Sequence, residues 1–216
     1  MNSRRLIPGL AFLGFVLVIA RVAAPSRAAE GLSETRNVSG FDHIRLTGPF
    51  STEITAGRPT LVTLYGDRDV VNRITTEVDG DTLVIGMRNE WGFNRKAKLV
   101  IALPELRGLA NDGAGSVRIS GLAGGDIEIE NAGAGSIVAS GRVANESIAL
   151  DGVGKIDTTA LEAKDVTVSN NGVGSVRVRV SGVLTASVNG VGEIRYTGNP
   201  SHVESQVFGI GRIDRL

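Results

Sequence analysis

The sequence predicts an all-β protein, a right-handed parallel β-helix (a β-solenoid) with coils of about 19 residues, preceded by a β-rich N-terminal section. The motif Gly-x-Gly occurs six times in the second half of the chain, at intervals of 18 to 20 residues. A β-branched aliphatic residue stands two positions after the second glycine of every motif. A fixed period of this length is typical of stacked repeats, and parallel crossovers are right-handed as a rule. The glycine pairs are Gly113/Gly115, Gly133/Gly135, Gly152/Gly154, Gly172/Gly174, Gly190/Gly192 and Gly209/Gly211.

Each motif marks a structural corner between two short strands, because glycine tolerates positive φ and lets neighbouring backbones approach closely. About 19 extended residues at roughly 3.3 Å each span about 60 Å, enough for one flattened coil that stacks on the previous coil at ~4.8 Å. Equivalent residues of successive coils then form columns. We expect an internal column of Val117, Ile137, Ile156, Val176, Ile194 and Ile213. The residue between the glycines is always apolar, so we also expect Ala114, Ala134, Val153, Val173, Val191 and Ile210 to point inward.

The section before the motifs, residues 38–107, shows alternating apolar residues separated by turn formers. This pattern is typical of consecutive β-strands. The expected strands are Phe41–Leu46, Phe50–Thr55, Thr60–Tyr65, Ile74–Val78, Thr82–Met87 and Lys98–Leu103. A single helical turn is expected at Asp67–Arg73, and no segment has the sustained 3.6-residue period of a longer helix.

The first 28 residues have the composition of an export signal. Arg4 and Arg5 precede an unbroken apolar run from Leu10 to Ala20, and Ser26-Arg27-Ala28 offers small residues for cleavage. We therefore expect a signal peptide at 1–28 cleaved near Ala28, a short linker at 29–37, a single domain at 38–216, and a periplasmic or cell-surface location. An uncleaved anchor is the alternative, although the apolar run is short against the ~20 residues that span a bilayer.

Charge and cysteine content exclude several classes of function. The chain has 23 basic and 23 acidic residues, and four of the arginines precede Ala28, so the mature chain has 23 − 4 = 19 basic residues and a net charge of about −4. This balance gives no electrostatic basis for binding nucleic acid, and we expect no membrane insertion of the mature chain. There is no cysteine, which excludes disulfides, thiolate metal sites and a lipid-modified cysteine.

Several segments together resemble the autotransporter adhesin "head GIN" domain family, over about residues 38–214. They are Phe41–Leu46, Leu61–Asp67, Leu83–Ile85, Leu103–Leu106, the Gly-x-Gly ladder and Ile194–Pro200. The resemblance implies an exported bacterial protein with a β-helical fold and an adhesive role. It supplies no catalytic residues to transfer.

No residue pattern identifies a catalytic, cofactor-binding or metal site, and we predict none of the three. Phosphate-binding Gly-x-Gly loops lead into a helix, which is absent after all six motifs. Calcium-binding repeats need a recurrent aspartate, whereas only Asp157 and Asp214 fall at a constant offset. His43 and His202 lie far apart in the sequence. Stacking is expected to bring Asp151 near Asn131, Asn171 and Asn189, where such residues are usually turn formers.

The segment between two predicted strands at residues 90–96 is the candidate partner contact. It contains Trp91, Phe93, Arg95 and Lys96, and aromatic and arginine side chains are favoured interface anchors. The alternative is that Trp91 and Phe93 fold back over the open end of the core. A second candidate surface consists of outward arginines, namely Arg118, Arg177, Arg179, Arg195 and Arg212, which would suit an acidic glycan.

We therefore expect a non-catalytic exported binding, adhesive or structural module that presents a rigid solenoid surface to a glycan or surface protein. Two alternatives stay open. One is a polysaccharide-active β-helical enzyme, which would need carboxylates clustered on one face. The other is a self-assembling envelope scaffold, because Gly211–Leu216 leaves an open strand edge through which homo-oligomers could form.

Overall fold

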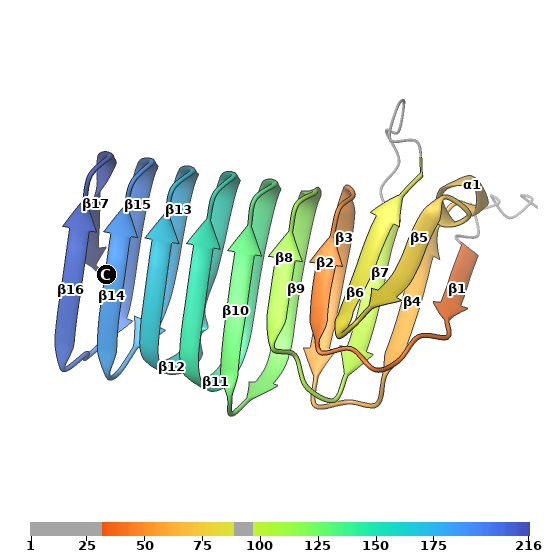
Figure 1. The fold of residues 1–216 in the computed structure, drawn as a ribbon, viewed down its shortest axis with the longest axis horizontal. Coiled ribbons are helices and arrows are strands. Elements are labelled where there is room, and N and C mark those ends of the chain that lie inside the picture. The colour runs from red at the N-terminus through yellow and green to blue at the C-terminus, as the bar shows by residue number, and fades with distance from the viewer. Residues whose placement is uncertain (1–31, 89–96) are drawn as a thin grey trace, which may run out of the picture.

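The protein is a β-solenoid in a computed structural model that describes residues 32–88 and 97–216 (Figure 1). All 17 strands of the described residues belong to one sheet, which coils into about five turns of roughly 20 residues. The predicted fold class is confirmed. The single helix of the described residues, α1 (Arg68–Val71), is one turn long and lies where the sequence predicts it.

From residue 108 onward, each coil contributes one strand segment to each of two faces. The strands are β8 (Gly108–Asn111), β9 (Ala114–Ala123), β10 (Asp126–Asn131), β11 (Ala134–Leu150), β12 (Val153–Asn170), β13 (Val173–Val180), β14 (Val183–Val188), β15 (Val191–Gly198), β16 (His202–Val207) and β17 (Ile210–Arg215). One parallel ladder, which we call the front face, consists of β8, β10, the second halves of β11 and β12, β14 and β16. The back face is the ladder of β9, the first halves of β11 and β12, β13, β15 and β17.

The N-terminal section continues the same solenoid, but its coils do not stack in chain order. Its strands are β1 (Leu32–Arg36), β2 (His43–Leu46), β3 (Phe50–Ala56), β4 (Leu61–Gly66), β5 (Ile74–Asp79), β6 (Thr82–Met87) and β7 (Ala97–Leu103). The coil of β2 and β3 lies between the coil of β6 and β7 and the coil of β8 and β9. The chain therefore builds outward on one side of its first coil and then returns to the other side. The expected linker at 29–37 contains β1, which pairs with β4.

The predicted aliphatic column is confirmed. Its members pair in register from coil to coil on the back face. Val117, Ile137, Ile156, Val176 and Ile194 are buried, while Ile213 in the last coil is partly exposed. The stacked coils thus share one continuous apolar interior.

The corner is narrower than the whole Gly-x-Gly motif, and the prediction that both glycines lie in it is wrong. Only the first glycine of each motif lies in the bend between strands. The second glycine is the second residue of the following strand and pairs in register with its equivalents in the neighbouring coils. The ladder already begins at the residue between the glycines, since the backbone N–H of Ala134 donates to the Gly113 carbonyl at 2.9 Å, so the chain completes its turn before the second glycine. The six glycines reassigned from corner to strand are Gly115, Gly135, Gly154, Gly174, Gly192 and Gly211.

The prediction that the residue between the glycines points inward is also wrong. Val153, Val173, Val191 and Ile210 are 46 to 76% exposed, and the two alanines, Ala114 and Ala134, are exposed as well. Side chains alternate between the two sides of a strand, so the second glycine shares its side with the buried aliphatic residue two positions later. The residue before that glycine must therefore face solvent, and the six apolar residues form an exposed ridge beside the corner.

Both motif glycines are required by close backbone approach. A Cβ added at Gly174 would fall on the carbonyl oxygen of Gly154, and a Cβ at Gly172 would fall on that of Gly152. The same overlap repeats one coil earlier and one coil later. A side chain at either position, the corner glycine or the strand glycine, would push neighbouring coils apart.

Asparagine side chains fill most of the interior of the corner. The sequence analysis expected the residues between the motif glycines to occupy this space. Asn111, Asn131, Leu150 and Asn170 occupy one buried column, and Asn111 Nδ2 donates to Asn131 Oδ1 at 2.7 Å. Leu150 interrupts this ladder. Within the described residues, Asn131 Nδ2 and Asn170 Oδ1 have no hydrogen-bond partner.

A second amide ladder lies outside the corner. Asn189 Nδ2 donates to Asn171 Oδ1, and Asn171 Nδ2 donates to Asp151 Oδ1, both at 2.7 Å. The expected grouping of Asp151 with Asn171 and Asn189 is therefore correct. Asn131 belongs to the interior ladder instead, because it lies at the preceding strand position and points to the opposite side.

Leu150→Asn is expected to change the free energy of unfolding by less than about 1 kcal/mol. An amide at position 150 would accept from Asn131 Nδ2 and donate to Asn170 Oδ1, which satisfies two buried groups that each cost about 1–3 kcal/mol when unpaired. This gain offsets the loss of a buried leucine. Urea unfolding should show that the control, Leu184→Asn at a buried position between Val166 and Val203, loses about 3 kcal/mol or more. Equal losses in the two variants would contradict the ladder.

Candidate functional site

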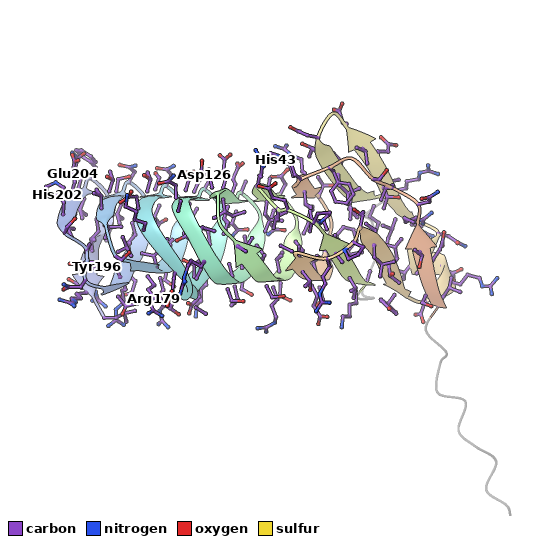
Figure 2. All side chains as sticks on the ribbon, turned by 90° about the horizontal axis from the view of Figure 1, so that it is seen from below. His43, Asp126, Arg179, Tyr196, His202 and Glu204 are labelled. Carbon is purple, nitrogen blue, oxygen red and sulfur yellow. The ribbon has the colours of Figure 1, made fainter. Side chains whose placement is uncertain are left out.

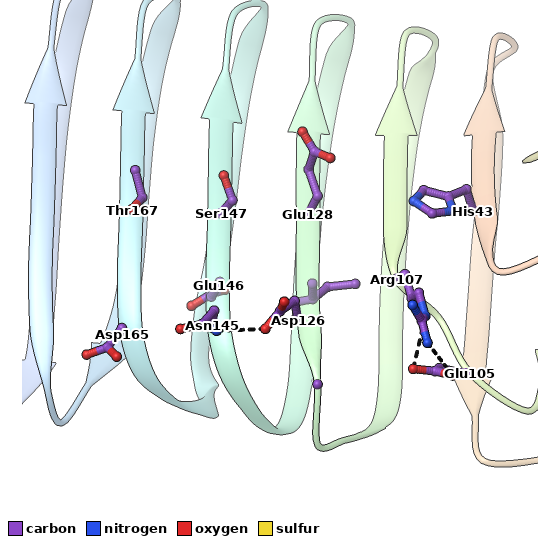
Figure 3. Close-up of a pocket in the computed structure, with 12 residues that line it drawn as sticks. His43, Glu105, Arg107, Asp126, Glu128, Asn145, Glu146, Ser147, Asp165 and Thr167 are labelled. Carbon is purple, nitrogen blue, oxygen red and sulfur yellow. Dashed lines mark hydrogen bonds and ion pairs between the residues drawn. The ribbon is translucent and has the colours of Figure 1, made fainter.

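A groove of about 690 Å³ lies on the front face (Figure 3). It runs from β2 to β12, across five neighbouring strand positions. Side chains of β2, β10, β11 and β12 line it, and Glu105 and Arg107 contribute from the segment that precedes β8. Polar side chains dominate its lining, namely His43, Glu105, Arg107, Asp126, Glu128, Asn145, Ser147, Asp165 and Thr167. We call this surface the acidic groove.

The register of the parallel ladder sets the order of side chains in the groove. His43, Gly108, Glu128, Ser147 and Thr167 occupy one row of mutually paired outward positions. A Cβ at Gly108 would collide with the imidazole of His43, so this glycine makes room for the histidine ring. A parallel row contains Asp126, Asn145 and Asp165, two positions earlier in each strand.

The charge of the groove is negative. Arg107 is its one arginine, and it is engaged by Glu105, which accepts hydrogen bonds at 3.1 and 3.3 Å, and by Asp42 at 3.4 Å. These carboxylates raise the pKa of the Arg107 guanidinium above its ordinary value, the hydrogen bond with Glu105 being the largest cause. Asp165 forms an ion pair with Lys164 at 3.7 Å. Asp126 and Glu128 have no ion-pair partner among the described residues, although the charge of Asp126 also contributes weakly to the raised pKa of Arg107.

Two of these carboxylates are also held in place by neighbouring groups. Asn145 Nδ2 donates to Asp126 Oδ1 at 2.7 Å, and the backbone N–H of Val183 donates to Asp165 Oδ1 at 2.8 Å. Figure 2 shows His43, Asp126 and Glu204 on one side of the solenoid and Arg179 on the other. Asp126 and Glu204 therefore lie on the front face, whereas Arg179 lies on the opposite side.

His43 lies between two aspartates at one end of the groove. Its Nδ1 is 2.6 Å from Asp42 Oδ1 and 3.9 Å from Asp81 Oδ2. One ligand atom from each of the three residues lies within 4.8 Å of the others, which is compatible with a metal ion. The guanidinium of Arg107 already neutralises Asp42, however, and a cation placed there would be repelled by it. The sequence analysis missed this cluster because Asp81 is brought to His43 only by the pairing of β2 with β6.

Comparison with protein families identifies the chain. The model described as "Putative auto-transporter adhesin, head GIN domain" matches residues 40–200. The chain belongs to this family. Curated proteins, in contrast, include no match.

Solved structures share the fold of this family member. A "putative adhesin" from Bacteroides fragilis superposes with a TM-score of 0.69 at 24% identity, covering 88% of this chain and 98% of that one. A "putative adhesin" from Parabacteroides merdae gives 0.54 at 14% identity, covering 88% and 97%. A "putative lipid binding protein" from Parabacteroides distasonis gives 0.53 at 21% identity, covering 88% and 98%. At these identities the likeness establishes the fold alone.

Beneath the groove, this head GIN domain buries a carboxyl group in its apolar core. Glu146 pairs in register with Ile127 on one side and Val166 on the other, and it is 2% exposed. Neither of its carboxyl oxygens has a hydrogen-bond partner among the described residues. Burial raises the pKa of the Glu146 carboxyl to about 8. The Thr158 hydroxyl lowers this pKa slightly, and it donates to the backbone carbonyl of Arg177 at 3.3 Å.

The arginines predicted to form a strip lie on the back face and divide into two groups. Arg118, Arg177 and Arg195 share one outward column, which Val138 and Asp157 interrupt. Arg179 pairs with Glu162 at 3.1 Å, and Arg212 pairs with Glu193 at 2.7 Å. The strip is therefore discontinuous.

The candidate contact residues Trp91, Phe93, Arg95 and Lys96 lie outside the described residues. Across residues 32–88 and 97–216, no helix is both long and apolar enough to cross a membrane. The motif glycines, at the corner and at the start of the back-face strands, contribute nothing to the groove, which is lined by residues that carry no recurrent motif. The signal that could have found the groove is the two-residue alternation around the buried Ile127 and Ile129, which places Asp126, Glu128 and Glu130 together outside.

The stability of this protein is expected to fall as pH rises from about 5 to about 8. The folded-state pKa of Glu146 lies above its ordinary value near 4.5, so in this interval the folded chain keeps a proton that the unfolded chain releases. The slope is at most about 1.4 kcal/mol per pH unit. Urea unfolding across this range should show that Glu146→Leu removes this contribution and stabilises the protein most at alkaline pH.

The matched control is Glu128→Gln, which removes an exposed acid from the strand beside Glu146. It should leave the pH dependence unchanged. If wild type, Glu146→Leu and Glu128→Gln lose stability in parallel as pH rises, the carboxyl of Glu146 is not the group responsible.

Proposed function

We propose that this head GIN domain is a non-catalytic binding module, and that its acidic groove receives an extended, positively charged segment of a surface protein. The observation that carries the proposal is the group of outward-facing carboxylates of Asp126, Glu128 and Asp165 on β10 and β12. Among the described residues, Asp165 alone of the three has an ion-pair partner, Lys164 at 3.7 Å. Complementary charge steers a partner to its site and disfavours partners of like charge.

The dimensions of the groove suit an extended chain. Five strands at about 4.8 Å spacing span roughly 19 Å, the length of about six residues in an extended peptide. The hydroxyls of Ser147 and Thr167 lie in the same row as Glu128 and can donate or accept hydrogen bonds along that path. Because the rows belong to a paired sheet, these groups are ordered before a ligand binds, which lowers the entropic cost of binding.

The environment of the acids supports binding in preference to catalysis. Among the described groups of the groove, the carboxyl with a raised pKa is that of Glu146, whose oxygens are shielded from solvent and from any ligand. Asp126 and Asp165 are fixed by local hydrogen bonds. The family description and the names of two of the three similar structures are those of adhesins, and the third is named a lipid binding protein; both kinds of name agree with a binding role.

Export of the protein, with cleavage near Ala28, is part of this proposal. The basic residues and apolar run of 1–28 support it, as does the family description. The intact mass of the protein purified from expressing cells should correspond to a chain beginning near Ala29. A mass that retains residues 1–28 would instead support the uncleaved anchor.

The binding experiment uses a labelled peptide, (Lys-Ser)₃, titrated against the purified protein, with (Glu-Ser)₃ and an array of neutral glycans alongside. We expect saturable binding of the basic peptide that weakens about tenfold or more between low and high salt, since exposed charges are screened. No binding of the acidic peptide is expected. Preference for neutral glycans, or binding independent of salt, would overturn the cationic ligand.

Two double variants test whether the acidic groove is the binding site. Asp126→Asn with Glu128→Gln removes two charges from the groove with little change in shape, and should weaken binding about tenfold. The matched control, Glu53→Gln with Asp157→Asn, removes two charges from outward positions of the back face. It should change affinity less than about twofold. Equal weakening in both pairs would show that net charge, and not the groove, is responsible.

A further inference from the structure

We propose that two copies of this chain join end to end through β16 and β17, related by a two-fold axis that extends both faces as antiparallel pairs. The partner is therefore a second copy of the same protein. This inference does not rest on the acidic groove, which lies several coils away, and the two proposals can fail separately.

The last coil exposes positions that are buried in the coil before it. Val203 and Val207 are 38% and 46% exposed, whereas Leu184 and Val188, their register partners in β14, are fully buried. Ile213, the last member of the aliphatic column, is likewise partly exposed, whereas its register partner Ile194 is buried. Within the described residues, no strand pairs with the outer edge of β16 or of β17. Apolar side chains and unpaired backbone groups thus occur together at this end, the combination that favours strand addition.

A single axis can serve both edge strands. Antiparallel pairing of a strand with its own copy needs one residue on the two-fold axis, and inward side chains must meet inward side chains. Ser205 in β16 and Ile213 in β17 both occupy inward columns, with Ala186 and Ile194 as their register partners. Each lies four residues from Gly209 at the corner. The two residues therefore face each other across the coil, and one axis can pass through both.

The sequence is self-complementary about this axis. In β17, Arg212 would face Asp214 of the second copy, and Ile210 would face Leu216. In β16, Val203 would face Val207 across the interior, and Glu204 would face Gln206. Opposite charges and apolar pairs across strands are both stabilising.

The neighbouring registers bring like charges together. Centring β17 on Arg212 places two arginines opposite each other, and centring it on Asp214 places two aspartates opposite each other. Centring β16 on Glu204 does the same with two glutamates. Like charges directly opposite are destabilising, so the register about Ser205 and Ile213 is selected.

Cross-linking tests the axis directly. Opposed residues of antiparallel strands have Cα atoms about 4.5–5.5 Å apart, within the range a disulfide spans. The chain has no cysteine, so Ser205→Cys introduces one thiol. Under mild oxidation it should form a disulfide-linked dimer in most of the protein. The control Ser51→Cys, exposed at a distance from this end, should not. Equal cross-linking of both variants, or none with Ser205→Cys, would overturn the proposed axis.

Charge reversal tests the register in solution. Sedimentation of the purified protein over a range of concentrations should show a reversible dimer. Arg212→Asp and Asp214→Arg each place like charges opposite each other twice, and each should weaken the dimer about tenfold or more. Mixed in equal amounts, the two variants present only opposite charges and should form a heterodimer as strong as the wild-type dimer. A protein that stays monomeric at all concentrations, or variants that do not recover on mixing, would overturn the proposal.

Discussion

The constraint on which the rest of this structure depends is the contact between backbones at the Gly-x-Gly motifs. At each motif the chain lies so close to the previous coil that a Cβ on either glycine would fall on a carbonyl oxygen. This contact fixes which residue lies above which, and the same register then determines the apolar column, both amide ladders and the rows of the groove. Local glycine chemistry therefore sets long-range order along the coils from Gly113 onward.

Much of the fold could be predicted from the sequence because the repeat is regular. The spacing of the motifs indicated the coil length, and the aliphatic residue after each motif, such as Val117, identified the core. The expectations for the ridge residues, including Val153, and for the second glycines, including Gly135, are wrong because the following strand, with its alternating side chains, already begins within the motif. The stacking order of the first coils could not be predicted, since nothing local in β2 shows that β8 will return to its side.

The site was harder to predict because it depends on register and not on motif. Glu128 and Thr167 lie 39 residues apart and become neighbours of one row only through the pairing of β10, β11 and β12. Glu146 is the sharpest example. In the sequence it is a single acid between the polar residues Asn145 and Ser147, yet its place between Ile127 and Val166 puts it inside the core. The front face thus carries negative charge outside and a carboxyl group of raised pKa beneath, and only the structure distinguishes the two.

The direction of the backbone hydrogen bonds has a mechanical consequence. In the solenoid these bonds join one coil to the next and so lie along the long axis (Figure 1). A pull between the two ends loads them in tension, and coils then peel away one after another because each is held chiefly by its neighbours. Each coil of roughly 20 residues releases about 65 Å of extended chain. Under load, such a molecule would lengthen in even steps and dissipate work while the remaining coils stay folded.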